Sequence, residues 1–509
     1  MGRRAGGKRS VLGVVLVLAS SAPLLGLLAG RPVSTPADNS DAVATPVRHV
    51  VEIMLENHSF DNLFANFSGA DGMPHGQRFP APGAYFTSLP SVAPVVAGPN
   101  EGDVYGGINN SRPAEKMAMD YTPGRGYLMD GYTLYPTDGL ASVTELPPPL
   151  DPNLQYLARH YELADMNFQP AIAPTQPNVD YALAATSNGW TYNNTPPASK
   201  DRWSSIFDEL SRAGRSWGAF FGTPLSDLQG TVWEHLVPPG TSADLAPVSQ
   251  FLSDLSDGRL PDFSLIRPGV GYSEEPPEDV GEGDAWLGQL VSAVANSAYW
   301  ASTAIFVTYD EGGGFFDHVR PPVVDPYGYG TRTPMVIVSP YARRGVLGAR
   351  TTNISILSFV QHLWGLAPLD ALNARQNDLA DAFDFRRPPL PPPILPVAPA
   401  ETIGFYGSGS QTDVPTPVPG APVSIHLRVN TAALLLDETA SGVVRLACVP
   451  PLGDAVPAGF PRSVPLSGGE GAFSLAFPAA GYYRIEARGP GSSLGWVTVD
   501  VGVGPNAAP

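Results

Sequence analysis

Short apolar runs alternate along the chain with segments whose apolar residues recur at helical spacing. Five runs predict buried strands, and six segments predict helices, one of which begins at a cap formed by Asp284. This alternation is typical of a mostly parallel α/β sheet with helices on both faces. The predicted strands span residues 48–55, 217–221, 263–266, 304–307 and 335–338, and the other helices span 153–160, 178–185, 204–213, 251–255 and 355–366.

The pattern changes near both ends of the chain. Residues 1–30 combine early basic residues with a long apolar run, which predicts a signal peptide or an N-terminal membrane anchor. A polar linker at 31–45 leads into the main domain, 46–387. Residues 388–419 are rich in Pro and Gly and predict a second linker. Residues 420–504 alternate like strands between Gly and Pro turns, which predicts a small antiparallel β-sandwich.

Composition narrows the functional classes. The 509 residues carry a net charge of -18, which argues against a nucleic-acid partner. The single cysteine, Cys448, excludes an intramolecular disulfide and gives little support to thiolate chemistry. Together with the N-terminal segment, these features predict an acidic, extracytoplasmic protein that is either secreted or anchored.

Two predicted strands end in oxygen-bearing side chains. Asp310 and Glu311 follow the strand at 304–307, and Glu56 and Asn57 follow the strand at 48–55. In an open parallel sheet, ligands gather outside the carboxyl ends of the strands. Carboxylate and amide oxygens there suit a hard divalent cation, although a lone acidic pair is more often a solvated loop. Because two strands share this ending, the sequence favours one common site.

Thr175 precedes the helix predicted at 178–185. A threonine in this position is commonly a helix cap. The free N–H groups and the dipole of a helix N-terminus also attract anions, so Thr175 is equally placed to meet a phosphate. The local sequence leaves both interpretations open.

Taken together, these segments resemble the bacterial phosphoesterase family, which includes phospholipases C and acid phosphatases and has an alkaline-phosphatase-like fold. The resemblance covers about residues 47–366 and excludes the C-terminal β domain. It rests on the ordered segments Glu56–Phe64, Asp310–Gly313, Asp317–Val319, Met129–Gly131 and Thr175–Asn178.

The resemblance implies a role for each of these residues. Thr175 is implied as the nucleophile that forms a phospho-enzyme intermediate. His318 is implied as the proton donor or as a phosphate contact, the alternative being a structural histidine bonded to Asp317. The family's single divalent metal, of open identity, would be held by Glu56, Asn57, Asp310 and Glu311, and substrate would be bound by Asn178 and Asp317.

Two positions depart from the family pattern. Gly312 stands where many members have histidine after the Asp-Glu pair, and Glu275 stands where a Ser-Glu-His-Pro element has its histidine. The main expectation is a secreted metal-dependent phosphoesterase of the phospholipase C type, with a phosphate-ester substrate and possible association with membranes or cell surfaces. The alternatives are an acid phosphatase acting on phosphomonoesters and a non-catalytic surface protein that retains the fold.

Overall fold

The computed structural model describes most of the chain from residue 45 to residue 501. Residues 1–44 lie outside it, and so do the predicted signal or anchor and nearly all of the predicted linker 31–45. Among the described residues, no helix has the length and apolar character that crossing a membrane requires. The structure also leaves out residues 75, 80–94, 97–107, 123, 135–140, 147–150, 194–201, 223–234, 242–243, 270–271, 277, 279, 397–401, 407–417, 431–439, 450–455, 480, 490–493 and 502–509.

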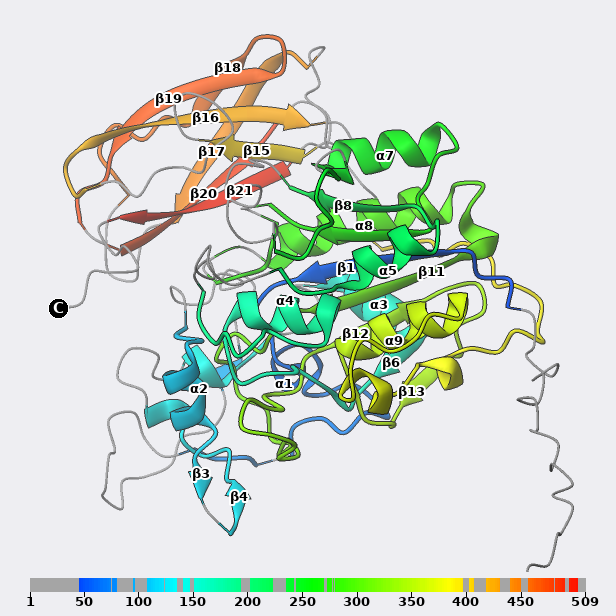
Figure 1. Ribbon diagram of the computed structural model, residues 1–509. Coiled ribbons are helices and arrows are strands. Elements are labelled where there is room, and N and C mark those ends of the chain that lie inside the picture. Colours follow the sequence, from blue (N-terminus) through cyan, green and yellow to red (C-terminus); the bar gives the residue numbers. More distant parts are fainter. Residues whose placement is uncertain are drawn as a thin grey trace, which may run out of the picture. The chain divides into compact units, whose positions relative to one another are not determined.

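A central sheet of eight strands organises the main domain, in the order β13-β6-β12-β11-β1-β10-β8-β9 (Figure 1). Strand β12 runs antiparallel to both neighbours, whereas β11, β1, β10, β8 and β9 are parallel. The predicted mostly parallel α/β sheet is confirmed. The strands are β1 (His49–Leu55), β6 (Glu162–Ala164), β8 (Trp217–Phe221), β9 (Leu245–Pro247), β10 (Phe263–Arg267), β11 (Thr303–Tyr309), β12 (Met335–Val338) and β13 (Gly345–Leu347).

Helices cover both faces of this sheet (Figure 1). Helices α4, α5 and α9 pack together on one face, and α3 packs with α8 on the other. Because both faces are covered, β1 and β11 are apolar along almost their whole length, which explains why their sequences do not alternate. The helices are α3 (Pro152–His160), α4 (Thr175–Ala184), α5 (Ile206–Arg212), α7 (Val248–Ser256), α8 (Val280–Ala295) and α9 (Ile354–Trp364).

The predicted start of α8 was wrong. The helix begins at Val280, so Asp284 lies inside it rather than at its cap. The Asp284 carboxylate instead accepts hydrogen bonds from the backbone N–H groups of Asn153 (3.0 Å) and Leu154 (2.7 Å). These are the free donors of the first turn of α3, so Asp284 caps a neighbouring helix.

The segment between β1 and α3 consists mainly of loops and short elements, and its apolar side chains form a separate small cluster around Met119, Tyr132 and Phe316. Helix α2 is the element of this segment that reaches the site described below. The short elements of this segment are α1 (Phe60–Phe64), β2 (Val95–Val96), α2 (Arg112–Ala118), β3 (Tyr121–Thr122), β4 (Gly126–Tyr127) and β5 (Thr144–Glu145). Two further short strands lie elsewhere in the main domain and pair with each other, β7 (Asn167–Phe168) and β14 (Thr351–Thr352).

The C-terminal region forms a second sheet of seven strands, in the order β18-β17-β20-β21-β15-β16-β19. Its pairings are antiparallel except for the contact of β15 with β21. Strand β15 lies within the segment 388–419 that was expected to be a linker. The strands are β15 (Thr402–Tyr406), β16 (Pro422–Asn430), β17 (Gly442–Val449), β18 (Ser463–Leu466), β19 (Glu470–Ala476), β20 (Gly481–Arg488) and β21 (Leu494–Val501).

Candidate active site

The carboxyl ends of three adjacent strands meet at one edge of the central sheet. Leu55 at the end of β1 is level with Tyr309 at the end of β11, so Glu56 and Asp310 emerge side by side. On the other side of β1, strand β10 ends in Arg267. This edge is where the sequence predicts a cation site.

Hydrogen bonds join the residues that follow β1 to the turn that follows β11. Oδ1 of Asp310 accepts from the backbone N–H groups of Asn57 (3.2 Å) and Glu311 (2.8 Å). The Glu311 carboxylate accepts from the Asn110 side chain and from the Gly313 N–H, both at 2.6 Å. Gly313 has φ +64°, and a Cβ there would lie 2.1 Å from the Asn57 carbonyl oxygen, so only glycine fits. These bonds connect Asn57, Asp310 and Glu311 at the edge where Glu56 also emerges, and their role as metal ligands stays a prediction.

The donor set fits a hard divalent cation. Asn57 and Asp310 are 4% and 0% exposed, yet Asn57 Oδ1 and Asp310 Oδ2 have no hydrogen-bond donor in the described part of the chain. Buried acceptors without a partner are costly in a folded protein. Oxygen atoms of this kind are the ligands that Ca²⁺, Mg²⁺ and Mn²⁺ prefer.

The site concentrates negative charge. Burial, and then the neighbouring Glu56 carboxylate, raise the pKa of Asp310 from 3.8 to about 7, while Arg267 opposes the shift. Burial also raises the pKa of Glu311 well above its usual range, with Asp310 and Glu115 adding to the effect. A bound cation would offset this repulsion, which agrees with the free oxygens.

Both departures from the family pattern lie at this site. A Cβ on Gly312 would lie 3.0 Å from Thr331 Cβ and 3.3 Å from Gln169 Oε1, so these two side chains occupy the space beside it. The carboxyl group of Glu275 lies against that of Glu56, and burial of this group together with the neighbouring acid raises its pKa. The chain therefore places glycine and a further acid where the family pattern has imidazoles.

Thr175 is the first residue of α4, and the cap position belongs to Pro174. The interpretation of Thr175 as a helix cap is therefore wrong. The loop that leads into Thr175 is tied to the acidic turn, because Gly312 N–H donates to Oε1 of Gln169 (2.8 Å). Thr175 is partly exposed, so its hydroxyl lies at the start of a helix with its side chain open to a ligand.

Asn178 holds this loop through its side chain. The amide accepts from the Ala171 N–H (2.9 Å) and donates to the carbonyl oxygens of Ala173 (2.5 Å) and Pro174 (3.2 Å). The residue is fully buried. These bonds fix the backbone that carries Thr175, and the expected role of Asn178 in substrate binding stays a prediction.

His318 and Asp317 belong to a second charged cluster. His318 Nδ1 lies 2.8 Å from Oδ2 of Asp61, and Nε2 lies 3.4 Å from Asp71. Its expected structural partner, Asp317, instead pairs with Nε of Arg332 (2.8 Å). Burial alone would lower the pKa of His318, but the hydrogen bond and charge of Asp61 outweigh it and the pKa is raised.

Asp61, Asp317 and His318 form a possible metal site, since one ligand atom of each lies within 4.8 Å of the others. Arg332 is fully buried between the two aspartates and also contacts Asp61 (3.2 Å). Every oxygen of the two carboxylates already has a donor. The Asp317 carboxylate is thereby engaged by protein donors, and its expected role in substrate binding stays a prediction. Arg332 would compete with a cation at this cluster, as Arg267, which pairs with Glu56 and Asp310, would at the first.

The sequence reasoning missed Asp61, Arg332, Arg267 and Glu115. Asp61 lies within the first quoted segment, and a second acid five residues after Glu56 was an available signal. The arginines carry no local signal, because Arg267 meets Glu56 across 211 residues and Arg332 meets Asp317 and Asp61 across 15 and 271 residues.

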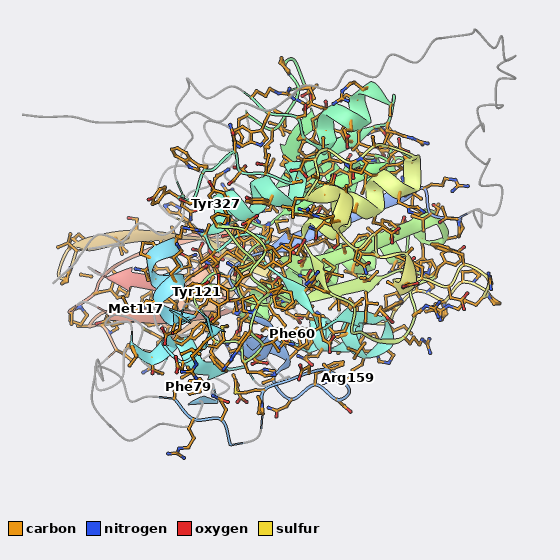
Figure 2. The ribbon with its side chains drawn as sticks, turned by 60° about the horizontal axis from the view of Figure 1, so that its bottom comes forward. Phe60, Phe79, Met117, Tyr121, Arg159 and Tyr327 are labelled. Atoms are coloured by element: carbon orange, nitrogen blue, oxygen red, sulfur yellow. The ribbon has the colours of Figure 1, made fainter. Side chains whose placement is uncertain are left out.

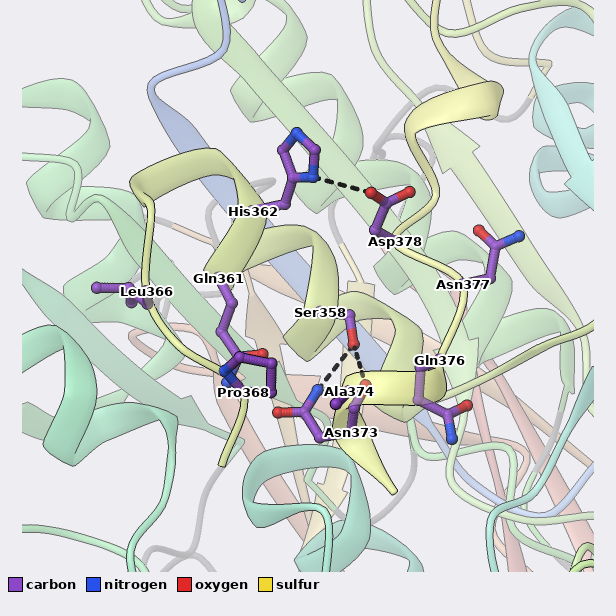
Figure 3. A pocket seen from close by; sticks show the side chains of 10 residues that line it. All are labelled: Ser358, Gln361, His362, Leu366, Pro368, Asn373, Ala374, Gln376, Asn377 and Asp378. Atoms are coloured by element: carbon purple, nitrogen blue, oxygen red, sulfur yellow. Dashed lines mark hydrogen bonds and ion pairs between the residues drawn. The ribbon is translucent and has the colours of Figure 1, made fainter. Parts of the chain in front are cut away.

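A hollow of about 490 Å³ lies elsewhere, between α9 and the loop that follows it (Figure 3). Its polar side chains satisfy one another. His362 faces Asp378 (2.8 Å), and the Asn373 amide donates to the Ser358 hydroxyl (2.8 Å). The hollow shares no residue with the acidic site and supplies no free ligand to it.

Comparison with known proteins settles the family. The model of the Phosphoesterase family matches residues 47–367, which contain both acidic strand ends and Thr175. The chain belongs to this family. The predicted enzyme class, a hydrolase of phosphoric ester bonds, is confirmed at this level. The C-terminal sheet lies outside the matched residues.

Relatives within the Phosphoesterase family include bacterial phospholipases C. The chain is 27% identical over 433 residues to phospholipase C B of Mycobacterium tuberculosis, covering 68% of this chain and 79% of that protein. It is 25% identical to a non-hemolytic phospholipase C of Burkholderia pseudomallei, and the match covers 78% of this chain and 67% of that protein. A solved structure of a protein in the alkaline phosphatase superfamily, from Vibrio parahaemolyticus, is 14% identical to this chain, with a TM-score of 0.33. The match covers 55% of this chain and 71% of that chain.

Proposed function

We propose that the protein is a metal-dependent phosphoesterase of the phospholipase C type. The observation that carries the proposal is the pair of buried, unpartnered oxygens on Asn57 and Asp310, placed together by β1 and β11. Glu56 and Glu311 complete the proposed ligand set. The phospholipase C relatives support the choice of reaction.

In the proposed reaction, the Thr175 hydroxyl attacks phosphorus and the alcohol of the ester leaves, so that a phosphothreonine forms. Water then cleaves this ester and releases phosphate or a phosphomonoester, which restores the threonine. Glu56, Asn57, Asp310 and Glu311 would hold a divalent cation, whose charge stabilises the phosphate oxygens and favours ionisation of the hydroxyl. The N-terminus of α4 adds its dipole to the same anion.

His318 is the proposed proton donor to the leaving alcohol. Asp61 binds its Nδ1 and so fixes the orientation of the ring. This leaves Nε2, whose one contact among the described residues is the long one with Asp71, as the nitrogen that exchanges a proton with substrate. Arg332 holds Asp61 in place from the other side.

A phospholipid substrate is supported by exposed apolar side chains near the site. Helix α2 carries Glu115, whose carboxylate accepts from Gln169 (3.0 Å) beside the acidic turn. Met117 on the same helix and Tyr121 just after it are 42% and 48% exposed (Figure 2). Apolar side chains beside a polar site suit contact with a lipid surface. The N-terminal apolar run supports an extracytoplasmic location, secreted or anchored, in agreement with such a substrate.

The reaction is tested with the chain from about residue 40, comparing p-nitrophenylphosphorylcholine with p-nitrophenyl phosphate, each with and without chelator. Chelator-sensitive turnover of the diester is the expected result. Turnover of the monoester alone would identify a phosphatase. If the protein binds metal but hydrolyses neither ester, the non-catalytic alternative replaces the proposal.

The lipid surface is tested with the double variant Met117→Ser, Tyr121→Ser. We expect hydrolysis of phosphatidylcholine vesicles to fall several-fold while turnover of the soluble diester stays unchanged. Val443→Ser, which changes a 52% exposed residue of the C-terminal sheet, is the matched control. Equal losses on both substrates would contradict a specific role at the lipid surface.

A further inference from the structure

Arg267 at the end of β10 is a buried cation that the proposed reaction has not yet used. It is 2% exposed, and its Nη2 lies 2.5 Å from Oε1 of Glu56 and 3.7 Å from Oδ2 of Asp310. Its Nη1 is buried as well and has no hydrogen-bond partner among the described residues. The guanidinium is therefore fixed on one side and unpaired on the other.

An unpaired donor of this kind calls for a ligand. A buried N–H group without an acceptor costs about 1–3 kcal/mol, and more when the group is charged. The guanidinium is planar and presents its donors as a rigid fork, which matches the oxygens of a carboxylate or a phosphate. With Nη2 held by Glu56, the free nitrogen belongs to a guanidinium that contacts two residues of the candidate cation site.

The charge balance of the site indicates the same type of ligand. Glu56, Asp310 and Glu311 lie together, and Glu115 and Glu275 add two further acids. A phosphate ester is itself an anion, so these carboxylates repel it. Arg267 is the described cation that touches Glu56 and Asp310 directly.

We propose that Arg267 binds a non-bridging phosphoryl oxygen of the substrate through Nη1 while Glu56 holds Nη2. This inference rests on the proposed function and assigns a phosphate-binding residue to that site. In this chain the arginine supplies positive charge to Glu56, whose carboxyl group lies against that of Glu275, the position at which the family pattern has an imidazole. Arg267 also stays bound to a proposed metal ligand, which places the phosphoryl group next to the cation site.

The experiment measures binding of inorganic phosphate by calorimetry, in the presence of the activating metal, together with metal content per chain. The variants are Arg267→Met and Arg267→Lys, and Arg259→Met is the matched control because Arg259 is 57% exposed and pairs only with surface aspartates. We expect Arg267→Met to weaken phosphate binding about 10- to 100-fold, the loss typical of a charged hydrogen bond, with metal content unchanged. Arg267→Lys keeps the charge but loses the planar pair of donors. This variant should weaken phosphate binding by at least roughly fivefold, which is less than the loss in Arg267→Met.

Each result decides the question. Wild-type phosphate affinity in either folded variant would overturn the inference. Tighter metal binding with unchanged phosphate affinity would overturn it too, and would show that Arg267 only competes with the cation. If Arg267→Met does not fold, Arg267→Lys carries the test. Phosphate binding that depends on Arg267 in a protein without esterase turnover would support the inference and disprove the proposed function instead.

Discussion

Two acidic clusters of the main domain differ in how their oxygens are satisfied. Asn57 and Asp310 each keep a buried oxygen without a hydrogen-bond donor. In contrast, every carboxylate oxygen of Asp61 and Asp317 accepts a hydrogen bond from Arg332 or from a backbone N–H group. A buried oxygen without a hydrogen-bond donor gains more from a cation than an oxygen that already has one. On this ground we propose metal binding at the first cluster and a positioning role for the second.

This assignment predicts opposite phenotypes for two aspartates. Asp310→Asn should lower the metal content from one ion per chain to about a tenth or less, because the variant loses an anionic ligand. Asp61→Asn should retain the metal but lower the free energy of unfolding by about 3–5 kcal/mol, since Arg332 is left buried with less negative charge. Elemental analysis and urea unfolding measure the two effects. Loss of metal from the Asp61 variant would reverse the assignment.

Thr175 is the residue on which turnover should depend most. Thr175→Ala removes the proposed nucleophile and should lower kcat by about a thousandfold or more, while metal content and the unfolding midpoint stay unchanged. Thr175→Ser keeps a hydroxyl and should retain a substantial part of the activity. Undiminished turnover in the alanine variant would remove Thr175 from this role.

Glu52 in the middle of β1 predicts an unusual dependence of stability on pH. Burial raises its pKa from 4.5 to about 8, and Arg267 only partly opposes the shift. The unfolded chain loses this proton near pH 4.5 and the folded chain keeps it until about pH 8. The contribution of Glu52 to stability therefore falls as pH rises through this window, by up to about 5 kcal/mol.

Glu52→Gln removes this titration while keeping the size of the side chain. The variant should match the wild type near pH 4.5 and become progressively more stable than it towards pH 8, as measured by urea unfolding across that range. Parallel stability curves for the two proteins would contradict the prediction.

At the scale of secondary-structure elements, Asp284 connects the two helices on one face of the sheet. Its carboxylate in α8 binds two N–H groups at the start of α3. Asp284→Ala should lower the free energy of unfolding by about 1–2 kcal/mol, the usual cost of losing a helix cap. Asp284→Asn, which keeps an acceptor oxygen, should cost less. An alanine variant as stable as the wild type would show that the cap is dispensable.

At the scale of the whole molecule, the two sheets have separate hydrophobic cores. The core of the main domain and that of the C-terminal sheet share no residue. We expect calorimetry to resolve two unfolding transitions, and added divalent metal should raise the midpoint of only one of them, because the proposed ligands all lie in the main domain. A single transition, or an equal shift of both, would show that the sheets unfold together.

The sequence by itself determined the strands, most of the helices and the position of the acidic site. Apolar runs define buried strands, and parallel neighbours end at the same edge, so the ends of the strands at 48–55 and 304–307 were predicted to share one site. The family resemblance then implied Glu56, Asn57, Asp310 and Glu311 as the ligands. The same reasoning misplaced the start of α8, because the carboxylate of Asp284 serves another helix. Only the tertiary structure decided which charges these residues meet. Arg267 reaches Glu56 and Arg332 reaches Asp61 across 211 and 271 residues of sequence, and no local pattern encodes a contact over that separation.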